Sequence, residues 1–159
     1  MARIELPEAG SENMLAFLDT IAYSEGTTRI YGSDDGYNVI VGGSLFEDYS
    51  DHPRRLIALP NLGIKSTAAG RYQLLERYFD SYKHELDLLD FSPRSQDLIA
   101  LQQIKECHAE SNIRAGDITS AIGQCSHIWA SLPGAGYGQH ENSLSTLLAI
   151  FENAGGTLA

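Results

Sequence analysis

Apolar residues near the start of the chain recur at helical spacing. Met14, Leu18 and Ile21 stand four and three residues apart, so they share one face of a helix. Ser11 is a typical N-cap for this helix, and Gly26 is a typical residue for its C-terminal end. The pattern therefore predicts a first helix that buries the row formed by Met14, Leu18 and Ile21.

The pattern then changes to one that is typical of strands and turns. Residues 37–41, with the sequence Tyr-Asn-Val-Ile-Val, are rich in β-branched and aromatic side chains, and two glycines follow them. They predict a short strand, and residues 44–51 predict a second strand and a turn. Both segments would belong to one small sheet.

Helical spacing of apolar residues returns in the second half of the chain. It predicts further helices over residues 70–86, 92–107, 117–129 and 143–151. Two of these begin with a Ser or an Asp that is suited to cap the helix. The sequence as a whole therefore predicts a mainly helical α+β fold with a small antiparallel β-sheet after the first helix.

The length of 159 residues fits one domain. We expect residues 11–159 to form that domain and residues 1–10 to be an N-terminal extension. A chain of this size buries roughly 70% of its unfolded surface, so its core needs neither a disulfide nor a structural metal. Cys107 and Cys125 are accordingly expected to be two free, buried thiols.

The charge of the chain excludes several classes of partner. It has 11 Lys and Arg against 21 Asp and Glu, a net charge of −10. Binding to a nucleic-acid duplex or to an anionic membrane requires a cluster of basic residues, and the sequence shows none. We therefore expect no nucleic acid and no stable membrane association among its partners.

The N-terminal residues indicate where the protein accumulates. The chain begins Met-Ala-Arg-Ile-Glu-Leu-Pro-Glu, which lacks the apolar region of a signal peptide. No apolar run approaches the ~18–20 residues of a membrane span. Accumulation in the cytoplasm of the cell that makes it is therefore expected.

Glu25 is the most informative candidate for chemistry. It continues the row of Leu18 and Ile21 by four positions, so its side chain is expected to project toward the core. It also lies in the last turn of the helix, where the helix dipole is negative. Both effects raise the pKa of a carboxyl group, and a carboxylic acid that stays protonated near neutral pH is suited to general-acid catalysis. The alternative is a helix-terminal Glu that bends out into solvent.

Other acidic residues lie in or beside the predicted sheet. Any of them is a candidate second catalytic carboxylate, although the pattern favours solvated loop charges and turn formers. The spacing of Asp48, Asp51 and His52 matches no strong metal-binding motif, so no metal is expected. These acids are Asp34, Asp35, Glu47, Asp48 and Asp51.

A glycine-rich segment near the C-terminus displays side chains that are typical of sugar-binding sites. Residues 134–139 read Gly-Ala-Gly-Tyr-Gly-Gln, without the strand and the Lys-Ser/Thr ending of a phosphate loop. The ring of Tyr137 can pack on the C–H face of a sugar, and the amide of Gln139 can bond to hydroxyl or N-acetyl groups. The alternative is a turn that carries a core tyrosine.

Five longer segments of the sequence, taken together, resemble one known protein family. They are Tyr-Ser-Glu-Gly at 23–26, Gly-Tyr-Asn-Val-Ile-Val-Gly-Gly at 36–43, Ala-Ala-Gly-Arg-Tyr-Gln-Leu-Leu at 68–75, Phe-Ser-Pro-Arg-Ser-Gln-Asp at 91–97, and Ile-Trp-Ala-Ser-Leu-Pro-Gly-Ala-Gly-Tyr-Gly-Gln at 128–139. These segments resemble the bacteriophage lambda endolysin family of lytic transglycosylases. The resemblance extends from about residue 15 to residue 157 in nearly unbroken register, which is far more specific than a single motif.

The resemblance implies a lysozyme-like fold and cleavage of the glycan strands of peptidoglycan, with formation of 1,6-anhydro-muramic acid. It also implies a monomer that needs no cofactor and that reaches the periplasm through an export pore. The catalytic acid of the family corresponds to Glu25. The motifs of the family imply six substrate-binding residues: Ser24, Gly70, Tyr72, Gln73, Tyr137 and Gln139.

Two other functions remain open from the sequence. A hydrolytic lysozyme would use Glu25 together with a second carboxylate, for which Asp34 or Asp35 is the candidate. A non-catalytic glycan-binding protein with a degenerate lysozyme fold would need neither residue for chemistry.

Overall fold

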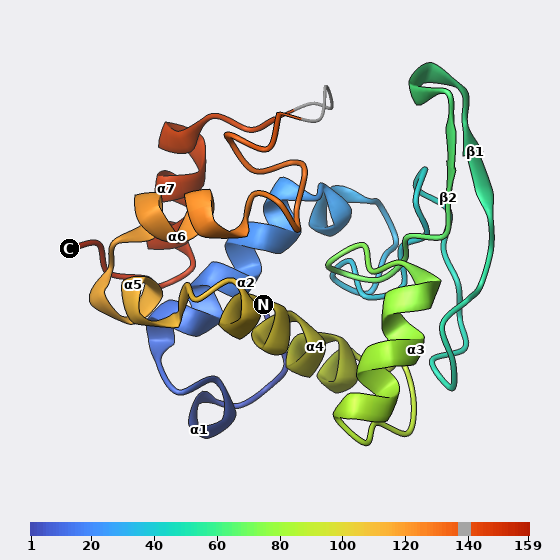
Figure 1. Cartoon of the computed structure of the whole chain (residues 1–159), viewed down its shortest axis with the longest axis horizontal. Coiled ribbons are helices and arrows are strands. Elements are labelled where there is room, and N and C mark those ends of the chain that lie inside the picture. Colours follow the sequence, from blue (N-terminus) through green and yellow to red (C-terminus); the bar gives the residue numbers. More distant parts are fainter. Residues whose placement is uncertain (137–140) are drawn as a thin grey trace.

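The computed structural model describes residues 1–136 and 141–159. In this part of the chain there are seven α-helices, two short 3₁₀ helices and one two-stranded sheet (Figure 1). Helix α2 runs through the centre, with α5, α6 and α7 on one side and α3 and the sheet on the other. The elements are α1 Leu6–Ala9, α2 Glu12–Ser24, η1 Thr27–Arg29, β1 Ile57–Leu59, η2 Pro60–Leu62, β2 Ile64–Ser66, α3 Glu76–Glu85, α4 Pro93–Glu106, α5 Glu110–Ala115, α6 Ile118–Cys125 and α7 Leu144–Asn153.

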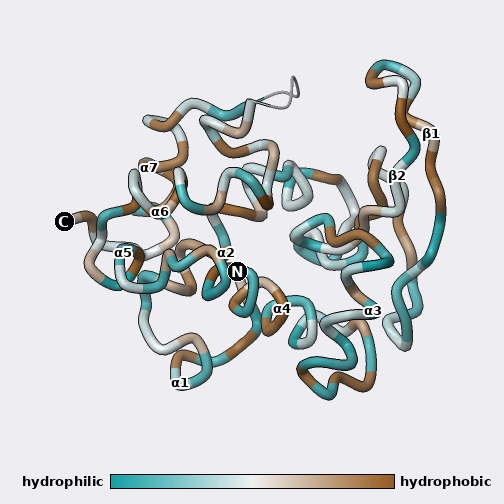
Figure 2. The backbone as a smooth tube through the Cα atoms, in the orientation of Figure 1, coloured by the Kyte–Doolittle hydropathy of each residue, from teal (hydrophilic) through white to brown (hydrophobic). Residues whose placement is uncertain are grey.

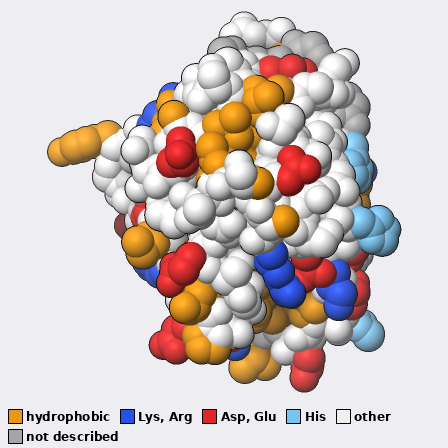
Figure 3. All heavy atoms as spheres, turned by 90° about the vertical axis from the view of Figure 1, so that its left-hand side faces the viewer, with side chains coloured by type: hydrophobic (Ala, Val, Ile, Leu, Met, Phe, Trp, Pro, Cys, Tyr) orange, Lys and Arg blue, Asp and Glu red, His pale blue; other side chains and the backbone are white. Residues whose placement is uncertain are grey.

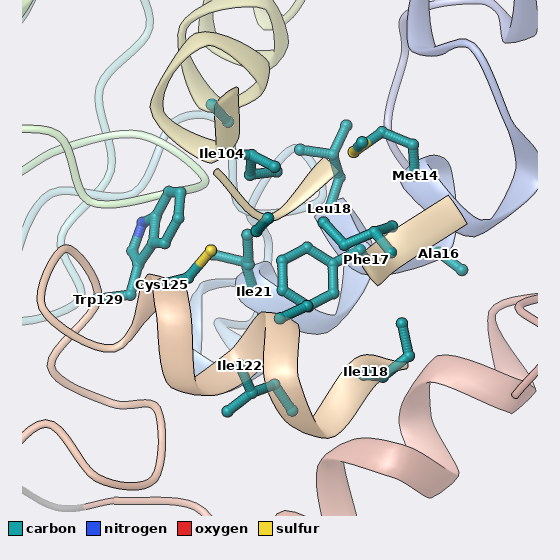
Figure 4. Close-up of a cluster of buried hydrophobic side chains, with 14 of the residues drawn as sticks. Met14, Ala16, Phe17, Leu18, Ile21, Ile104, Ile118, Ile122, Cys125 and Trp129 are labelled. Carbon is teal, nitrogen blue, oxygen red and sulfur yellow. The ribbon is translucent and has the colours of Figure 1, made fainter. Parts of the chain in front are cut away.

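Helix α2 is the predicted first helix of the domain, and it forms the centre of the main hydrophobic core. The Ser11 side chain accepts a hydrogen bond from the backbone N–H of Met14 at 3.1 Å, as expected of an N-cap. Met14, Leu18 and Ile21 are at most 1% exposed. Figure 4 shows them converging with Ile122 of α6 and with side chains of α4. The apolar row is therefore the buried face of α2, as predicted.

The sheet is antiparallel and follows α2, as predicted, but it lies farther along the chain than expected. Strands β1 and β2 form a hairpin in which Ile57 faces Ser66 and Leu59 faces Ile64. The prediction of strands at 37–41 and 44–51 was wrong.

The first segment forms only isolated bridges, from Val39 to Leu45 and from Ile40 to Ala69. The N–H of Ile40 bonds to the carbonyl of Ser44 at 2.7 Å, which closes a tight turn over two glycines with φ of +92° and +99°. Val39 and Ile40 are therefore buried beside a turn and not paired in a sheet, and Val41 is partly buried.

The later helices agree with the sequence pattern except at some of their ends. Helices α4, α6 and α7 begin after Ser92, Asp117 and Ser143, each of which caps its helix through its side chain. The predicted helix over residues 70–86 begins only at α3. The residues before it include Gly70 and Gln73 with φ of +82° and +52°, which no α-helix accommodates.

Two further differences concern helix length and helix number. Helix α6 ends at Cys125, four residues before the predicted end at residue 129. The short helices α1 and α5 were not predicted. Cys107 and Cys125 are free and buried, as expected.

The N-terminal segment packs on the main core. Ile4 and Ala9 are each 4% exposed and belong to the same hydrophobic cluster as α2. The backbone N–H groups of Arg3 and Ile4 donate to the Asp97 carboxylate at 2.7 and 3.0 Å. The segment is thereby attached to α4.

The molecular surface mixes acidic, basic and apolar side chains. On the face drawn in Figure 3, the basic side chains lie among acidic ones. Figure 2 shows hydrophobic and hydrophilic stretches along the hairpin of β1 and β2. Ile64 of β2 and Leu56, which precedes β1, are 48% and 62% exposed. Within the described residues, no helix combines the length and the hydropathy that crossing a bilayer requires.

Candidate functional site

Glu25 lies in a cleft at the C-terminal end of α2. Its backbone N–H still bonds to the carbonyl of Ile21 at 2.9 Å, so the residue is fixed by the last turn of the helix. The cleft has a volume of about 300 Å³, and Glu25 is the one ionisable residue among the described residues that line it. The lining residues are Glu25, Gly26, Thr27, Ile30, Val39, Ile40, Gly42, Gly43 and Gln73.

The environment of Glu25 favours the protonated carboxyl group. Burial raises its pKa from the ordinary value of 4.5 to about 7, and a hydrogen bond from Ser131 opposes part of this effect. The sequence pattern predicted the direction of the shift and burial as its cause, whereas the helix dipole, the second cause expected from the sequence, is not among the causes in the structure. A carboxyl group with this pKa is divided between acid and carboxylate near neutral pH, as a group that both donates and accepts a proton must be.

A chain of hydrogen bonds connects Glu25 to the segment before α7. The Ser131 hydroxyl donates to Oε1 of Glu25 at 2.5 Å, and the Ser24 hydroxyl donates to Oγ of Ser131 at 2.9 Å. Nδ2 of Asn142 donates to Oγ of Ser24 at 3.2 Å. Ser24, predicted to bind substrate, therefore lies beside the acid and contacts the residues that hold it.

Gln73 lines the same cleft as Glu25, and its backbone adopts a left-handed conformation with a φ of +52°. Its Nε2 atom donates to the carbonyl oxygens of Gly70 and Val39 at 2.9 and 3.3 Å. These bonds fix the amide, so the carbonyl oxygen Oε1 is the group that remains for a ligand. The structure thus brings the predicted residues Gln73 and Glu25 together in one cleft, while Ser24 does not line it and connects to Glu25 through Ser131.

Gly70 supports this arrangement because no side chain fits at its position. A Cβ atom would lie 2.3 Å from Oε1 of Gln96 and 2.9 Å from Cζ of Phe91. Its φ of +82° also lies in the region that favours glycine. Gly70 therefore shapes the turn that carries Gln73.

Replacing Gly70 by alanine is expected to reduce the free energy of unfolding by about 2–4 kcal/mol, because strain and overpacking add. Urea denaturation measures the loss. Gly63 is the matched control, because its φ is +64° and no atom lies within 4 Å of the position that a Cβ would take. Gly63→Ala should cost about 1 kcal/mol from strain alone. Equal losses at the two positions would contradict the packing argument.

Tyr72 is buried behind the cleft. Its hydroxyl donates to Oδ1 of Asp97 at 2.6 Å, and Nε1 of Trp129 donates to its backbone carbonyl at 3.2 Å. These contacts connect Tyr72 to α4 and to the segment after α6, so they stabilise the structure around the site. A substrate-binding role for Tyr72 stays a prediction. Tyr137 and Gln139 lie outside the described residues.

The candidate second carboxylates Asp34 and Asp35 are bound elsewhere. Asp34 pairs with Arg3, and the hydrogen bond from Arg3 is the main reason why the pKa of Asp34 is lowered. Asp35 pairs with Arg71 and with the amino group of Met1. Neither lines the cleft of Glu25.

The other acidic candidates border a separate hollow. This hollow has a volume of about 570 Å³ and is lined by residues between 45 and 55, with Glu47, Asp48 and Asp51 among them. Within the described part of the chain, no three His, Cys, Asp or Glu side chains gather as metal ligands would.

The sequence analysis missed Ser131 and Asn142 as site residues. Each is a single polar residue in a loop, without a spacing that relates it to Glu25. They lie 106 and 118 positions from their partners at the end of α2, so only the fold brings them together.

Comparison with known proteins places the chain in a family. A model of the family described as Endolysin matches residues 15–158. The chain belongs to the endolysin family. Among curated relatives, it is similar to the endolysin of Escherichia phage lambda, with 60% identity over 145 residues that cover 90% of this chain and 91% of the relative. It is also similar to the endolysin of Escherichia phage P2, with 49% identity over 158 residues that cover 93% of this chain and 96% of that relative.

Solved endolysin structures have the same fold. The chain is similar to bacteriophage lambda lysozyme complexed with a chitohexasaccharide, with a TM-score of 0.89 and 55% identity over the full length of both chains. A second structure of lysozyme from bacteriophage lambda gives a TM-score of 0.84 and 54% identity, again over both full chains. The lysozyme-like α+β fold expected of this endolysin is therefore confirmed.

Proposed function

We propose that this endolysin is a lytic transglycosylase that cleaves the β-1,4 bond between N-acetylmuramic acid and N-acetylglucosamine in peptidoglycan. The observation that carries the proposal is Glu25, a carboxyl group whose pKa burial raises to about 7 in a cleft with no other ionisable lining residue among those described. The chitohexasaccharide bound to the similar lambda lysozyme supports a glycan strand as the ligand.

The reaction begins with Glu25 as general acid. Its carboxyl group gives its proton to the bridging oxygen while the bond to C1 of the muramyl residue breaks through an oxocarbenium-like state. Oε1 of Gln73 can accept a hydrogen bond from an N-acetyl N–H or a hydroxyl group, which would keep the sugar beside the acid.

The same group then acts as general base. The Glu25 carboxylate removes the proton from the C6 hydroxyl of the muramyl residue, and the C6 oxygen closes on C1 to form the 1,6-anhydro ring. The attacking group belongs to the substrate and is tethered, which gives it a high effective concentration. Bonding of Asp34 to Arg3 and of Asp35 to Arg71 supports a mechanism with one carboxylate.

The proposed substrate, peptidoglycan, determines the compartment in which the enzyme would act. We place its accumulation in the host cytoplasm and its action on periplasmic peptidoglycan after release through an export pore. The consequence of cleavage would be lysis of the host cell.

The products test the mechanism. Digestion of purified peptidoglycan in heavy-oxygen water should give muropeptides that end in 1,6-anhydro-muramic acid, one water lighter than lysozyme products and without label at C1. Mass spectrometry of the soluble fragments measures this. A hydrolytic lysozyme, digested in parallel, provides the labelled control.

Label at C1 in most cleavage events would contradict the transglycosylase and favour the hydrolytic lysozyme. Substitution of Asp34 and Asp35 would then show which of them assists Glu25. Absence of any soluble fragment would favour a non-catalytic glycan-binding protein.

A further inference from the structure

We propose that a one-way hydrogen-bond relay from Asn142 through Ser24 and Ser131 assigns the transferable proton of Glu25 to its Oε2 atom. The inference deepens the proposed function, because it rests on Glu25 as the acid that protonates the glycan. In this relay, Asn142, Ser24 and Ser131 are positioning residues, and Glu25 remains the group that would touch the substrate.

The orientation of the Asn142 amide fixes the start of the relay. Nδ2 lies 3.1 Å from the carbonyl oxygen of Ser24 and 3.3 Å from the carbonyl oxygen of Ser131. Carbonyl oxygens only accept hydrogen bonds, so the nitrogen and not the oxygen of the amide must face them. The same nitrogen lies 3.2 Å from Oγ of Ser24. Because the nitrogen has two N–H groups for three oxygens, one N–H is shared between the carbonyl oxygen and Oγ of Ser24, and that hydroxyl accepts from Asn142.

The direction of the next two bonds follows. The Ser24 hydroxyl, which accepts from Asn142, has its proton free to donate to Oγ of Ser131 at 2.9 Å. The Ser131 hydroxyl then accepts from Ser24 and donates to Oε1 of Glu25 at 2.5 Å. Reversal would turn the Ser24 proton away from Ser131, and a buried hydroxyl proton without an acceptor costs about 1–3 kcal/mol.

The end of the relay distinguishes the two oxygens of Glu25. A proton on Oε1 would point at the Ser131 hydroxyl proton, which already approaches that oxygen. The acid proton therefore belongs on Oε2, while Oε1 is the carbonyl oxygen and accepts from Ser131. Because bonds in such a chain polarise one another in one direction, the relay strengthens this assignment.

Among the described residues, the charged groups Arg29 and Glu141 bond elsewhere than to the relay. Arg29 lies over the ring of Tyr23 at 4.8 Å from its centroid. Glu141 accepts from the backbone N–H groups of Gly134 and Gly136 at 3.2 and 3.0 Å. The shift in the pKa of Glu25 has two causes, burial and the Ser131 hydrogen bond.

Infrared spectroscopy tests the relay without turnover. The C=O stretch of protonated Glu25, identified by its loss in Glu25→Gln, should move to higher frequency in Ser131→Ala, because the carbonyl oxygen loses its donor. It should also move up in Asn142→Leu, where the unlocked hydroxyls allow the proton to shift to Oε1. An unchanged band in both variants would overturn the proposal, whether or not Glu25 is the catalytic acid.

The pH dependence of peptidoglycan cleavage supplies a second readout. Both substitutions should move the alkaline limb of the rate to higher pH and lower the maximal rate about 10-fold, as the loss of one hydrogen bond predicts. The double variant should be no slower than Ser131→Ala alone, because both act through one relay. If the losses of rate in the two single variants add up in the double variant, and the alkaline limb of the pH–rate profile does not move, the proposal is overturned in favour of a purely structural role.

Two controls match the chemistry of the test variants. Ser126 is a buried serine whose hydroxyl donates to the carbonyl of Gly123 at 3.0 Å, and Ser126→Ala matches Ser131→Ala. Asn13 holds the carbonyl oxygens of Ile113 and Thr157 through Nδ2 at 3.0 and 3.1 Å, and Asn13→Leu matches Asn142→Leu. Neither control should change the infrared band or the pH limb. If Asn142→Leu does not fold, Ser24→Ala breaks the same relay at its next link, with the same two expected results.

Discussion

Replacing Glu25 by glutamine is expected to lower the rate of peptidoglycan cleavage by about 10²–10⁴-fold, the ordinary contribution of general acid–base catalysis. The amide has nearly the same shape as the carboxyl group, but it has no proton to give to the leaving oxygen. The rate of release of soluble muropeptides measures the loss. A variant that folds and keeps more than about a tenth of the wild-type rate would remove Glu25 from its role.

The same substitution should also change how stability depends on pH. The pKa of Glu25 in the folded chain is about 7, above its ordinary value of 4.5. A raised pKa in the folded state means that the wild type loses stability as the pH rises from about 4.5 through 7. Glutamine does not ionise, so Glu25→Gln should be more stable than the wild type at pH 8, by up to roughly 3 kcal/mol.

Thermal unfolding at several pH values separates this effect from a general change in stability. At pH values well below 4.5, where the wild-type carboxyl group is protonated in both states, the two proteins should unfold at similar temperatures. An equal difference at low and high pH would mean that burial of the charge is not the cause.

The second large effect is expected for Arg71, a guanidinium group in the interior. Its side chain is 1% exposed and lies 2.9 Å from Asp19 and 3.4 Å from Asp35. It also donates to the hydroxyl of Tyr72 at 3.2 Å. Replacement by methionine fills most of the volume but removes the buried guanidinium that Asp19 and Asp35 share, leaving the exposed amino group of Met1 as their remaining cation, so we expect a loss of about 3–5 kcal/mol in the free energy of unfolding.

Arg54 provides the matched control for Arg71. It pairs with Asp51, Glu76 and Asp80, but its side chain is 35% exposed. Exposed ion pairs contribute about 0–1 kcal/mol each, so Arg54→Met should cost much less than Arg71→Met. Urea denaturation of both variants makes the comparison. Similar losses would show that burial does not determine the contribution of Arg71.

The sequence could predict what local periodicity determines. The spacing of Met14, Leu18 and Ile21 places Glu25 on the inner side of α2, and this position, at the end of the helix, predicted its raised pKa. The caps of α4 and α6 were also predicted, because a cap involves neighbours only three positions away.

The sequence could not predict features that depend on backbone conformation or on distant partners. The positive φ of Gln73 ends any helix there, yet glutamine rarely adopts that conformation, so the helix over 70–86 was predicted too long. The β-branched pair Val39 and Ile40 was interpreted as a strand, although both side chains are buried in a turn. The partners of Ser131 became visible only in the folded chain.

The long-range hydrogen bonds to Asp97 affect how the chain folds. Its carboxylate gathers hydrogen bonds from Tyr72, Tyr37, Ile4 and Arg3, which lie 25, 60, 93 and 94 positions away. The burial of this carboxylate is compensated only when the N-terminal segment, Tyr37 and Tyr72 have met at α4. Contacts of such high sequence separation require the loops between them to close first, which slows folding. We therefore expect burial of Asp97 beside Tyr72 to be coupled to docking of the N-terminal segment.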